Sequence, residues 1–153
     1  MIEVDYEYRT DEGWATQTIK LDVDLDMSLS DETLNDDMCA LPRTIAYYSE
    51  ISAECQAMTA RRKNYMEVAE AAASQRIRAA AKESGDKITE PGIKEQVVSD
   101  DAVREARDLY YEADRQHRML DGFYRALREK ASISIAICYK QKEEMRTMNS
   151  PLE

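Results

Sequence analysis

Two clusters of basic residues are the groups in this sequence best suited to bind a ligand. Arg76, Arg78 and Lys82 lie close together, and an Arg-Arg-Lys run at 61–63 precedes them. Arginine and lysine make charge-assisted hydrogen bonds to phosphate, so such clusters can neutralise a nucleic-acid backbone. On a helix, Arg78 and Lys82 would be i, i+4 neighbours, with Arg76 to the side near the same end. The chemistry they predict is phosphate binding.

A solvated helical face is the alternative explanation of the same clusters. Glu67, Glu70 and Glu83 lie near enough in sequence to pair with the basic groups, and for a single subunit such pairing is the commoner case. In a closed ring, however, the same arginines would repeat around the perimeter and form a continuous track for a phosphate backbone. Tyr65 is the nearest aromatic residue that could stack on a base.

The sequence contains no recognisable catalytic or metal-binding spacing. The patterns GxGxxG, GxxxxGK[ST], HExxH and GxSxG are absent. His117 is the only histidine and lies on an apolar helical stripe, where a core or interface histidine is far commoner than a metal ligand. Cys39, Cys55 and Cys138 are odd in number and widely spaced, which favours small buried hydrophobic side chains over a disulfide or metal site. We therefore expect no enzyme, no metal and no cofactor.

The acidic run at 22–26 (Asp-Val-Asp-Leu-Asp) is similar to the opening of a calcium-binding loop. An EF-hand loop requires glycine at its sixth position and glutamate at its twelfth, where this chain has Met27 and Thr33. We therefore expect these carboxylates to alternate along one face of a strand.

Negative charge is concentrated at the N-terminus. The chain of 153 residues has 31 acidic and 21 basic side chains and a formal charge of −10. Residues 1–42 contain 12 of the acidic and 2 of the basic residues, which leaves 19 of each sign in residues 43–153. Anion binding must therefore come from local clustering. Because no apolar run reaches the roughly 20 residues of a membrane helix and no leader is evident, we expect a cytoplasmic protein without a membrane partner.

The first segment predicts a β-hairpin. Residues 2–9 alternate apolar and acidic side chains, and residues 14–25 alternate less regularly. A turn at 10–13 joins them, with Gly13 available for a positive φ. Because an isolated hairpin is marginally stable in water, it needs another surface to pack against.

The rest of the chain predicts helices. Ser30 is a candidate N-cap for a short acidic helix, Pro42 suits the first turn of the next, Gly85 suits a helix end, and Thr89 suits a further N-cap. The predicted helices cover about residues 28–40, 43–84, 90–98 and 101–147. The chain is thus predicted to be mainly α, with an acidic N-terminal β-hairpin at 1–27 and a helical domain at 28–153.

The two long helices are predicted to pair as an antiparallel hairpin and to assemble further. Each carries an apolar stripe that is too long to be covered within one subunit, so we expect a ring-like homo-oligomer. A glycine inside a helix costs about 1 kcal/mol relative to alanine, and we expect Gly122 to permit a close approach of the first long helix, with simple tolerance as the alternative. The residues expected in the core and subunit interfaces are Tyr48, Ile51, Met58, Tyr65, Leu120, Gly122, Phe123 and Leu127.

Four segments between residues 41 and 147 share their spacing and scattered identities with a known family. They are Tyr47-Tyr48-Ser49, then Gln75-Arg76-Ile77-Arg78 followed by Ser84-Gly85, then Val97-Val98-Ser99-Asp100-Asp101, and finally Leu120-Asp121-Gly122-Phe123-Tyr124-Arg125-Ala126-Leu127-Arg128-Glu129-Lys130. This pattern resembles the UvsY recombination mediators of phages.

The resemblance implies a function as well as a fold. It implies a ring-forming accessory protein that binds single-stranded DNA and helps a RecA-family recombinase displace single-strand-binding protein. The basic-x-basic pair with which that family contacts DNA matches Arg76 and Arg78, and helix geometry adds Lys82 one turn later. Residues 1–30 have no counterpart in the family pattern. Their negative charge is unlike a typical DNA binder and would suit contact with a partner protein or a weakening of DNA affinity.

Two other functions remain open from the sequence. The chain could be an acidic inhibitor or DNA mimic that docks on a basic protein through residues 22–37, in which case it would not bind DNA even at low salt. It could also be a helical oligomer with a structural or phage-assembly role, in which case replacing Arg76 and Arg78 would change only local stability.

Overall fold

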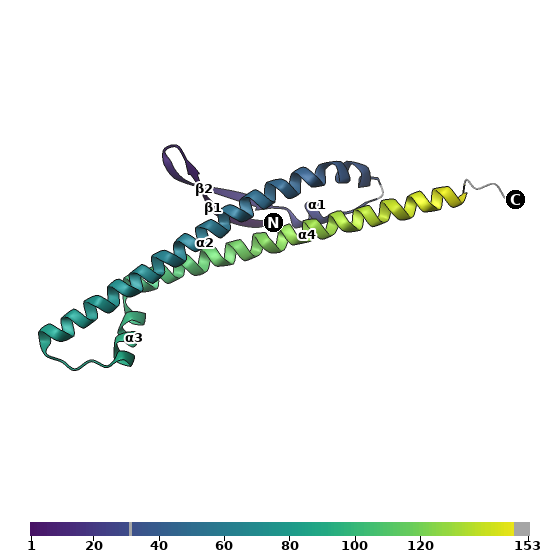
Figure 1. Cartoon of the computed structure of the whole chain (residues 1–153). Helices are drawn as coiled ribbons and strands as arrows, with labels where there is room; N and C mark the ends of the chain where they lie inside the picture. The colour runs from purple at the N-terminus through teal and green to yellow at the C-terminus, as the bar shows by residue number, and fades with distance from the viewer. Residues whose placement is uncertain (31, 149–153) are drawn as a thin grey trace. The chain divides into compact units, whose positions relative to one another are not determined.

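The structure is a computed structural model of the chain and describes residues 1–30 and 32–148. It is mainly helical, with an N-terminal antiparallel hairpin and a pair of long helices, as the sequence predicted (Figure 1). The elements in order are β1 (Ile2–Thr10), β2 (Gly13–Leu21), α1 (Val23–Met27), α2 (Leu34–Ser84), α3 (Glu90–Ser99) and α4 (Asp101–Met148).

The chain packs as two compact units. Unit 1 comprises Met1–Ala53 and Met119–Glu153, and unit 2 comprises Glu54–Arg118. Each unit therefore contains one part of α2 and one part of α4. The hairpin shares unit 1 with helical segments, and the division into 1–27 and 28–153 stays a prediction. Residues 149–153 of that predicted domain lie outside the described residues.

The hairpin buries one face, as its alternating sequence predicted. Val4 pairs with Ile19 and Ile2 with Leu21 across the two strands. Val4 and Leu21 are completely buried, and Ile19 is nearly so. Alternate side chains of a strand point to opposite faces, so the acidic residues of β1 lie on the other, exposed face. The turn that follows Thr10 uses Gly13 at φ 134°, the backbone region that favours glycine.

The second strand is shorter than predicted. It ends at Leu21, and Val23–Met27 forms the short helix α1. The acidic run at 22–26 therefore does not continue a strand face, which corrects the prediction of alternating carboxylates. Val23 is exposed, and the side chain of Leu25, predicted to extend the apolar strand face, lies outside the described part of the chain.

The predicted helix break at Pro42 is wrong. Helix α2 begins at Leu34 and passes through Pro42 to Ser84 as one helix. Proline removes one backbone donor from a helix interior. In this turn the Thr44 hydroxyl donates to the Ala40 carbonyl at 3.2 Å, and apolar anchors lie on either side of the proline, because Leu41 before it and Tyr48 after it are buried. This burial favours a continuous helix over the break that local propensity predicts. The Ser30 hydroxyl accepts a hydrogen bond from the Thr33 N–H just before α2 begins.

Unit 1 has a core of large side chains. Tyr48 of α2 meets Phe123 of α4 edge-on, with ring centroids 4.9 Å apart. Nearer the other ends of these segments, the Cys138 thiol lies 3.1 Å from the Met38 sulfur. Because the residue numbers rise along one helix as they fall along the other, the two segments are antiparallel. The buried apolar side chains of unit 1 are Val4, Tyr6, Ile19, Leu21, Leu34, Leu41, Tyr48, Ile51, Leu120, Phe123 and Leu127.

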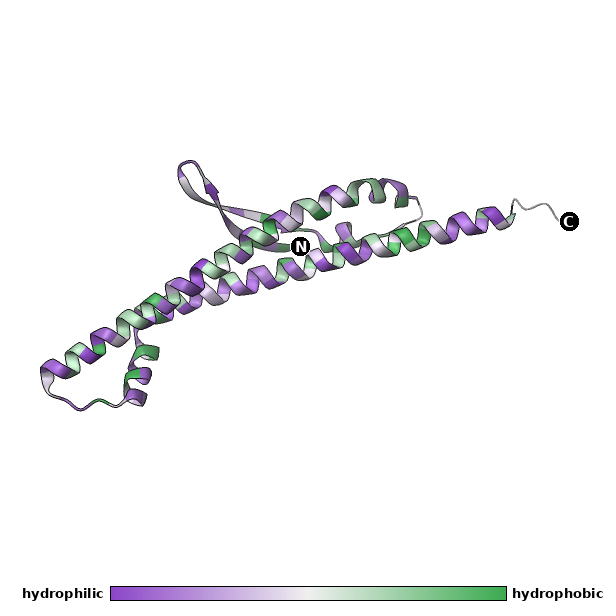
Figure 2. Ribbon diagram, in the orientation of Figure 1, coloured by the Kyte–Doolittle hydropathy of each residue, from purple (hydrophilic) through white to green (hydrophobic). Residues whose placement is uncertain are grey.

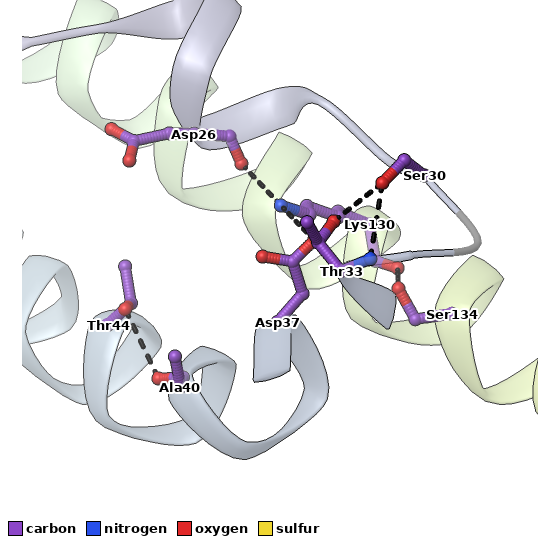
Figure 3. A network of polar contacts seen from close by, with 8 residues as sticks. All are labelled: Asp26, Ser30, Thr33, Asp37, Ala40, Thr44, Lys130 and Ser134. Atoms are coloured by element: carbon purple, nitrogen blue, oxygen red, sulfur yellow. Dashed lines mark hydrogen bonds and ion pairs between the residues drawn. The ribbon is translucent and has the colours of Figure 1, made fainter. Parts of the chain in front are cut away.

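A buried lysine of α4 connects this helix to α1 and to the first turn of α2. The Lys130 side chain is only 7% exposed, and its Nζ donates to the Asp26 carbonyl oxygen at 2.8 Å. The same Nζ lies 3.8 Å from the Asp37 carboxylate, which also accepts a hydrogen bond from the Thr33 hydroxyl. Figure 3 shows these groups converging around Lys130, with the carboxylate of Asp26 pointing away from it.

In unit 2, helix α2 ends and helix α3 begins at the residues that the sequence predicted for these positions. Gly85 follows α2 with φ 74°. Thr89 caps α3 by accepting from the Gly92 N–H at 3.4 Å. Asp100 separates α3 from α4. The core of this unit is built from small and branched side chains, and Ala73, Val103, Ile93 and Val97 form one cluster.

Two of the residues expected in the core or the subunit interfaces are exposed in the single chain. Tyr65 is 53% exposed, so it does not belong to the core of the chain. Gly122 is exposed, and a Cβ placed there would meet nothing within 4 Å. No backbone approaches this glycine within the described chain, which corrects the expectation of close helix packing there. The remaining residues, Tyr48, Ile51, Met58, Leu120, Phe123 and Leu127, are buried.

Figure 2 shows hydrophilic and hydrophobic residues interspersed along both long helices. Among residues 1–30 and 32–148, none of the helices combines the length and apolarity needed to cross a membrane.

Candidate nucleic-acid interface

The three basic residues singled out in the sequence lie on the last few turns of α2, inside unit 2. The side chains of Arg76 and Arg78 are 63% and 56% exposed. Lys82 is exposed and makes no ion pair or hydrogen bond with another side chain of the described residues. All three are accessible to a ligand, but the two arginines already have partners.

Arg76 is paired with the residue that precedes α4. Its Nη2 donates to Oδ2 of Asp100 at 3.0 Å. The other carboxylate oxygen of Asp100 accepts from the backbone N–H groups of Ala102 and Val103, at 3.1 and 3.3 Å. Such hydrogen bonds satisfy N–H groups that have no partner within the helix. Asp100 is therefore both the N-cap of α4 and the counter-charge of Arg76.

Arg78 is paired with the first residue of α3. Its Nη2 donates to both carboxylate oxygens of Glu90, at 3.0 and 2.9 Å. The Glu90 side chain is 69% exposed, whereas that of Asp100 is only 20% exposed. The two arginines therefore have counter-charges of very different solvent access.

Arg76 and Arg78 line different grooves. A groove of about 600 Å³, here the Arg76 groove, lies beside residues 86–88 and is lined by Arg76, Lys87, Asp86 and Asp100 above an apolar wall. A second groove of about 390 Å³, the Arg78 groove, has as its charged residues Glu70, Arg78, Glu90, Lys94 and Arg107. Residues two apart on a helix point in different directions. The pair thus offers two neighbouring cationic positions instead of one continuous patch.

Of the acidic partners that sequence proximity suggested, Glu67 is confirmed and Glu70 is not. Glu70 accepts from Arg107 of α4, at 2.7 and 3.0 Å, and not from a neighbour on α2. Oε1 of Glu67 lies 3.9 Å from Nζ of Lys63, which belongs to the basic run at 61–63. Both arginines of the candidate site are instead paired with residues from later in the chain.

Sequence reasoning missed the cations that the fold adds to the site. Lys87 comes from the loop after α2, Lys94 from α3 and Arg107 from α4. Arg107 stays engaged with Glu70, and both side chains are about one-third exposed or less. No pattern in the sequence placed these residues near Arg76 or Arg78, because their proximity depends on how the loop after α2 and helix α3 pack. The predicted N-cap at Thr89 was the sequence signal that bore on that packing.

Base stacking has little support at this site. Tyr65 is exposed, but on a helix it lies about 16 Å from Arg76 along the axis. Tyr110 and Tyr111 contact each other, with ring centroids 5.4 Å apart. The arrangement is therefore suited to bind a charged backbone through phosphates, with little means to distinguish bases.

Comparison of the chain with protein-family models, with curated proteins and with solved structures found no significant match in any of the three.

Proposed function

We propose that this protein is a non-enzymatic accessory protein that binds single-stranded DNA and helps a RecA-family recombinase displace single-strand-binding protein, as the resemblance to UvsY-like mediators implies. Such a function would be carried out in the cytoplasm. The observation that supports it best is the group of exposed cations at the end of α2, where the guanidinium groups of Arg76 and Arg78 are each held by a single carboxylate.

Energetics make these arginines available to phosphate. Exposed ion pairs contribute about 0–1 kcal/mol, so exchanging a carboxylate for a phosphate oxygen costs little. Phosphate binding also releases condensed counterions from the nucleic acid, which adds a driving force at low salt. Lys82, unpaired within the described residues, would add a third contact without any exchange.

Multivalency would compensate for the small number of cations in each copy. The net charge of −10 disfavours binding of a polyanion by one subunit. In a homo-oligomer, linked copies of the site bind one strand together, and their combined affinity exceeds that of each site by orders of magnitude. We therefore propose that the DNA-binding form is a homo-oligomer.

The test is binding of a fluorescently labelled oligothymidine, followed by anisotropy at low and moderate salt. We expect Arg76→Ala/Arg78→Ala to weaken binding about tenfold and to make it less salt-dependent, by roughly 0.7 in slope for each phosphate that the protein no longer neutralises. The matched control is Arg104→Ala/Arg115→Ala, which removes two exposed arginines of the same unit. Light scattering should show unchanged oligomer size. A well-formed wild-type oligomer that fails to bind at low salt would rule the proposal out.

A structural or assembly role is the second candidate, and exposed apolar side chains favour it. In unit 2, Tyr65, Val68 and Tyr111 are 53%, 58% and 61% exposed. In unit 1, Ile133 and Ile135 are nearly half exposed, within a stretch of α4 that is apolar on several sides. Apolar side chains exposed in numbers indicate protein contacts. Under this function Arg76→Ala/Arg78→Ala would change only local stability, while Ile133→Asp/Ile135→Asp would dissociate the oligomer.

A further inference from the structure

The two arginines of the candidate site are held by carboxylates that come from separate elements. Asp100 is the residue between α3 and α4, and Glu90 is the first residue of α3. Both contacts are at hydrogen-bond distance, 3.0 Å for Arg76 and 2.9 Å for the closer oxygen of Glu90 on Arg78. A carboxylate oxygen and a phosphate oxygen make the same charge-assisted hydrogen bond to a guanidinium group. The carboxylates thus occupy the positions that phosphate oxygens would take.

We propose that Asp100 and Glu90 regulate the site by competing with phosphate for Arg76 and Arg78, so that nucleic acid binds by displacing them. This inference rests on the proposed function, because it concerns the same arginines. Displacement does not remove the acidic groups: both stay near the arginines, Asp100 in its fixed position, and repel the incoming phosphate. Both effects lower affinity and restrict binding to a ligand with several phosphates.

The two carboxylates compete unequally. Asp100 is fixed because its other oxygen accepts two backbone N–H bonds at the start of α4, and its side chain is only 20% exposed. Glu90 is 69% exposed, and within the described chain its carboxylate bonds to Arg78 alone. Glu90 can turn into solvent at the cost of one exposed ion pair, whereas Asp100 stays in place. Arg78 should therefore be the first arginine to become available, and Asp100 should be the stronger competitor.

The substitutions that test this keep the fold. Asp100→Asn removes the charge but retains the oxygen that caps α4, because asparagine is as good an N-cap as aspartate. Glu90→Gln keeps the shape of the side chain. Matched controls are Asp101→Asn, whose side chain is 99% exposed one residue further along, and Glu95→Gln on the same helix α3. Each control changes the net charge equally and leaves the carboxylate partners of both arginines in place.

Affinity for labelled oligothymidine is the measurement, with the full-length protein at low salt. We expect Asp100→Asn to tighten binding about fivefold and Glu90→Gln about twofold, the range expected of exposed ion pairs. The controls should change affinity by less than the smaller of these effects. The decisive step is a double-mutant cycle, because in an Arg76→Ala background the gain from Asp100→Asn should disappear.

The outcomes separate this inference from the function on which it rests. Equal gains in the controls, or a gain that persists in the Arg76→Ala background, would show a general charge effect and overturn the competition. If the wild type binds through Arg76 and Arg78 but neither Asp100→Asn nor Glu90→Gln changes affinity, the competition fails while the proposed function stands. If no variant binds at low salt, both are overturned.

Discussion

The same two helices build two units that are stabilised differently. In unit 1, α2 and α4 enclose large apolar side chains, and Leu21, Leu120, Leu127 and Val4 are almost completely inaccessible to solvent. In unit 2, the fully buried positions are small residues such as Ala73, Ala106 and Cys55, with Val103 the largest apolar exception among the described residues. Because apolar stabilisation scales with the area buried, unit 1 gains more from each core position.

The charged groups of the two units also differ in burial. Lys130 of unit 1 is buried and bonded to a carbonyl oxygen, so its role is structural. Arg76 and Arg78 of unit 2 are exposed and held by carboxylate side chains. A buried charge is expensive to unpair, whereas an exposed pair exchanges readily. The comparison indicates that unit 1 supplies stability, while the end of unit 2 has the properties that a ligand-binding surface requires.

The largest effect should come from the core of unit 1. Leu127→Ala removes a side chain that is 1% exposed, and we expect a loss of about 3 kcal/mol of unfolding free energy. Val103→Ala in unit 2 removes fewer buried atoms and should cost about half as much. Urea unfolding followed by circular dichroism measures both. Leu109→Ala, at a side chain 37% exposed, is the control and should cost least. Equal losses at Leu127 and Val103 would contradict the contrast between the two cores.

Lys130 should produce the next effect. Lys130→Met keeps the aliphatic stem but leaves the Asp26 carbonyl without its donor and the Asp37 carboxylate without its nearby cation. We expect a loss of about 2 kcal/mol, since an unsatisfied, partly buried acceptor costs about 1–3 kcal/mol. Lys140→Met, at an exposed pair with Glu144, should change stability by less than about 0.5 kcal/mol. Similar losses for both lysines would show that the contacts of Lys130 with Asp26 and Asp37 do not stabilise the fold.

Amide exchange should separate the two units by roughly tenfold. Helix α3, described over its full length, has two buried side chains, Ile93 and Val97, and its ends depend on the caps at Thr89 and Asp100. Segments with few buried apolar contacts open at low free energy. The amide of Val97 should therefore exchange about ten times faster than those of Val4 and Ile19 in the hairpin. Slower exchange in α3 than in the hairpin would contradict the conclusion that unit 1 is the more stable unit.

The sequence predicted those parts of the fold that depend on local pattern. The alternation of β1 predicted its buried face, and Gly85 and Thr89 predicted helix ends through backbone geometry and capping. Pro42 was misleading because its local effect is outweighed by the buried residues on both sides of it. The prediction extended the second strand too far because the apolar alternation continues past Leu21. In the structure the strand ends there and α1 follows.

The candidate site could be predicted only in part. Arg76 and Arg78 are visible as a basic pair in the sequence, and the structure places both on the exposed surface of unit 2. Their spacing of two residues on a helix already separates their directions, but their pairing with Asp100 and Glu90 depends on the packing of α3, which no residue spacing encodes. Prediction of these contacts requires the positions of three helices at once.

Two glycines offer a smaller test of local conformation. A methyl group added to Gly122 in α4 would meet no described atom within 4 Å, so Gly122→Ala should stabilise the protein by about 0.7 kcal/mol through helix propensity. Gly85→Ala should destabilise it by about 1 kcal/mol, because Gly85 has φ 74°. Thermal unfolding measures both changes. If Gly122→Ala were destabilising while the oligomer dissociated, Gly122 would instead lie in a subunit contact.

Asp26 should give the smallest effect, and one that depends on pH. Burial, and then the neighbouring charge of Asp22, raise the pKa of the Asp26 carboxyl above its usual value of 3.8, while Lys130 opposes the shift. A raised native pKa means that the folded state holds this proton more tightly than the unfolded state. Its favourable contribution is complete below the unfolded pKa and is lost as pH rises through the folded value.

Asp26→Asn should therefore stabilise the protein slightly at neutral pH, because it removes a carboxylate that burial disfavours. The gain should fade as the pH is lowered below about 4, where the wild-type carboxyl also becomes neutral. The backbone carbonyl that binds Lys130 is unchanged by the substitution. Urea midpoints of both proteins at neutral and acidic pH test this. A loss of stability at neutral pH would mean that the Asp26 carboxylate, and not its carbonyl oxygen alone, stabilises the clasp with Lys130.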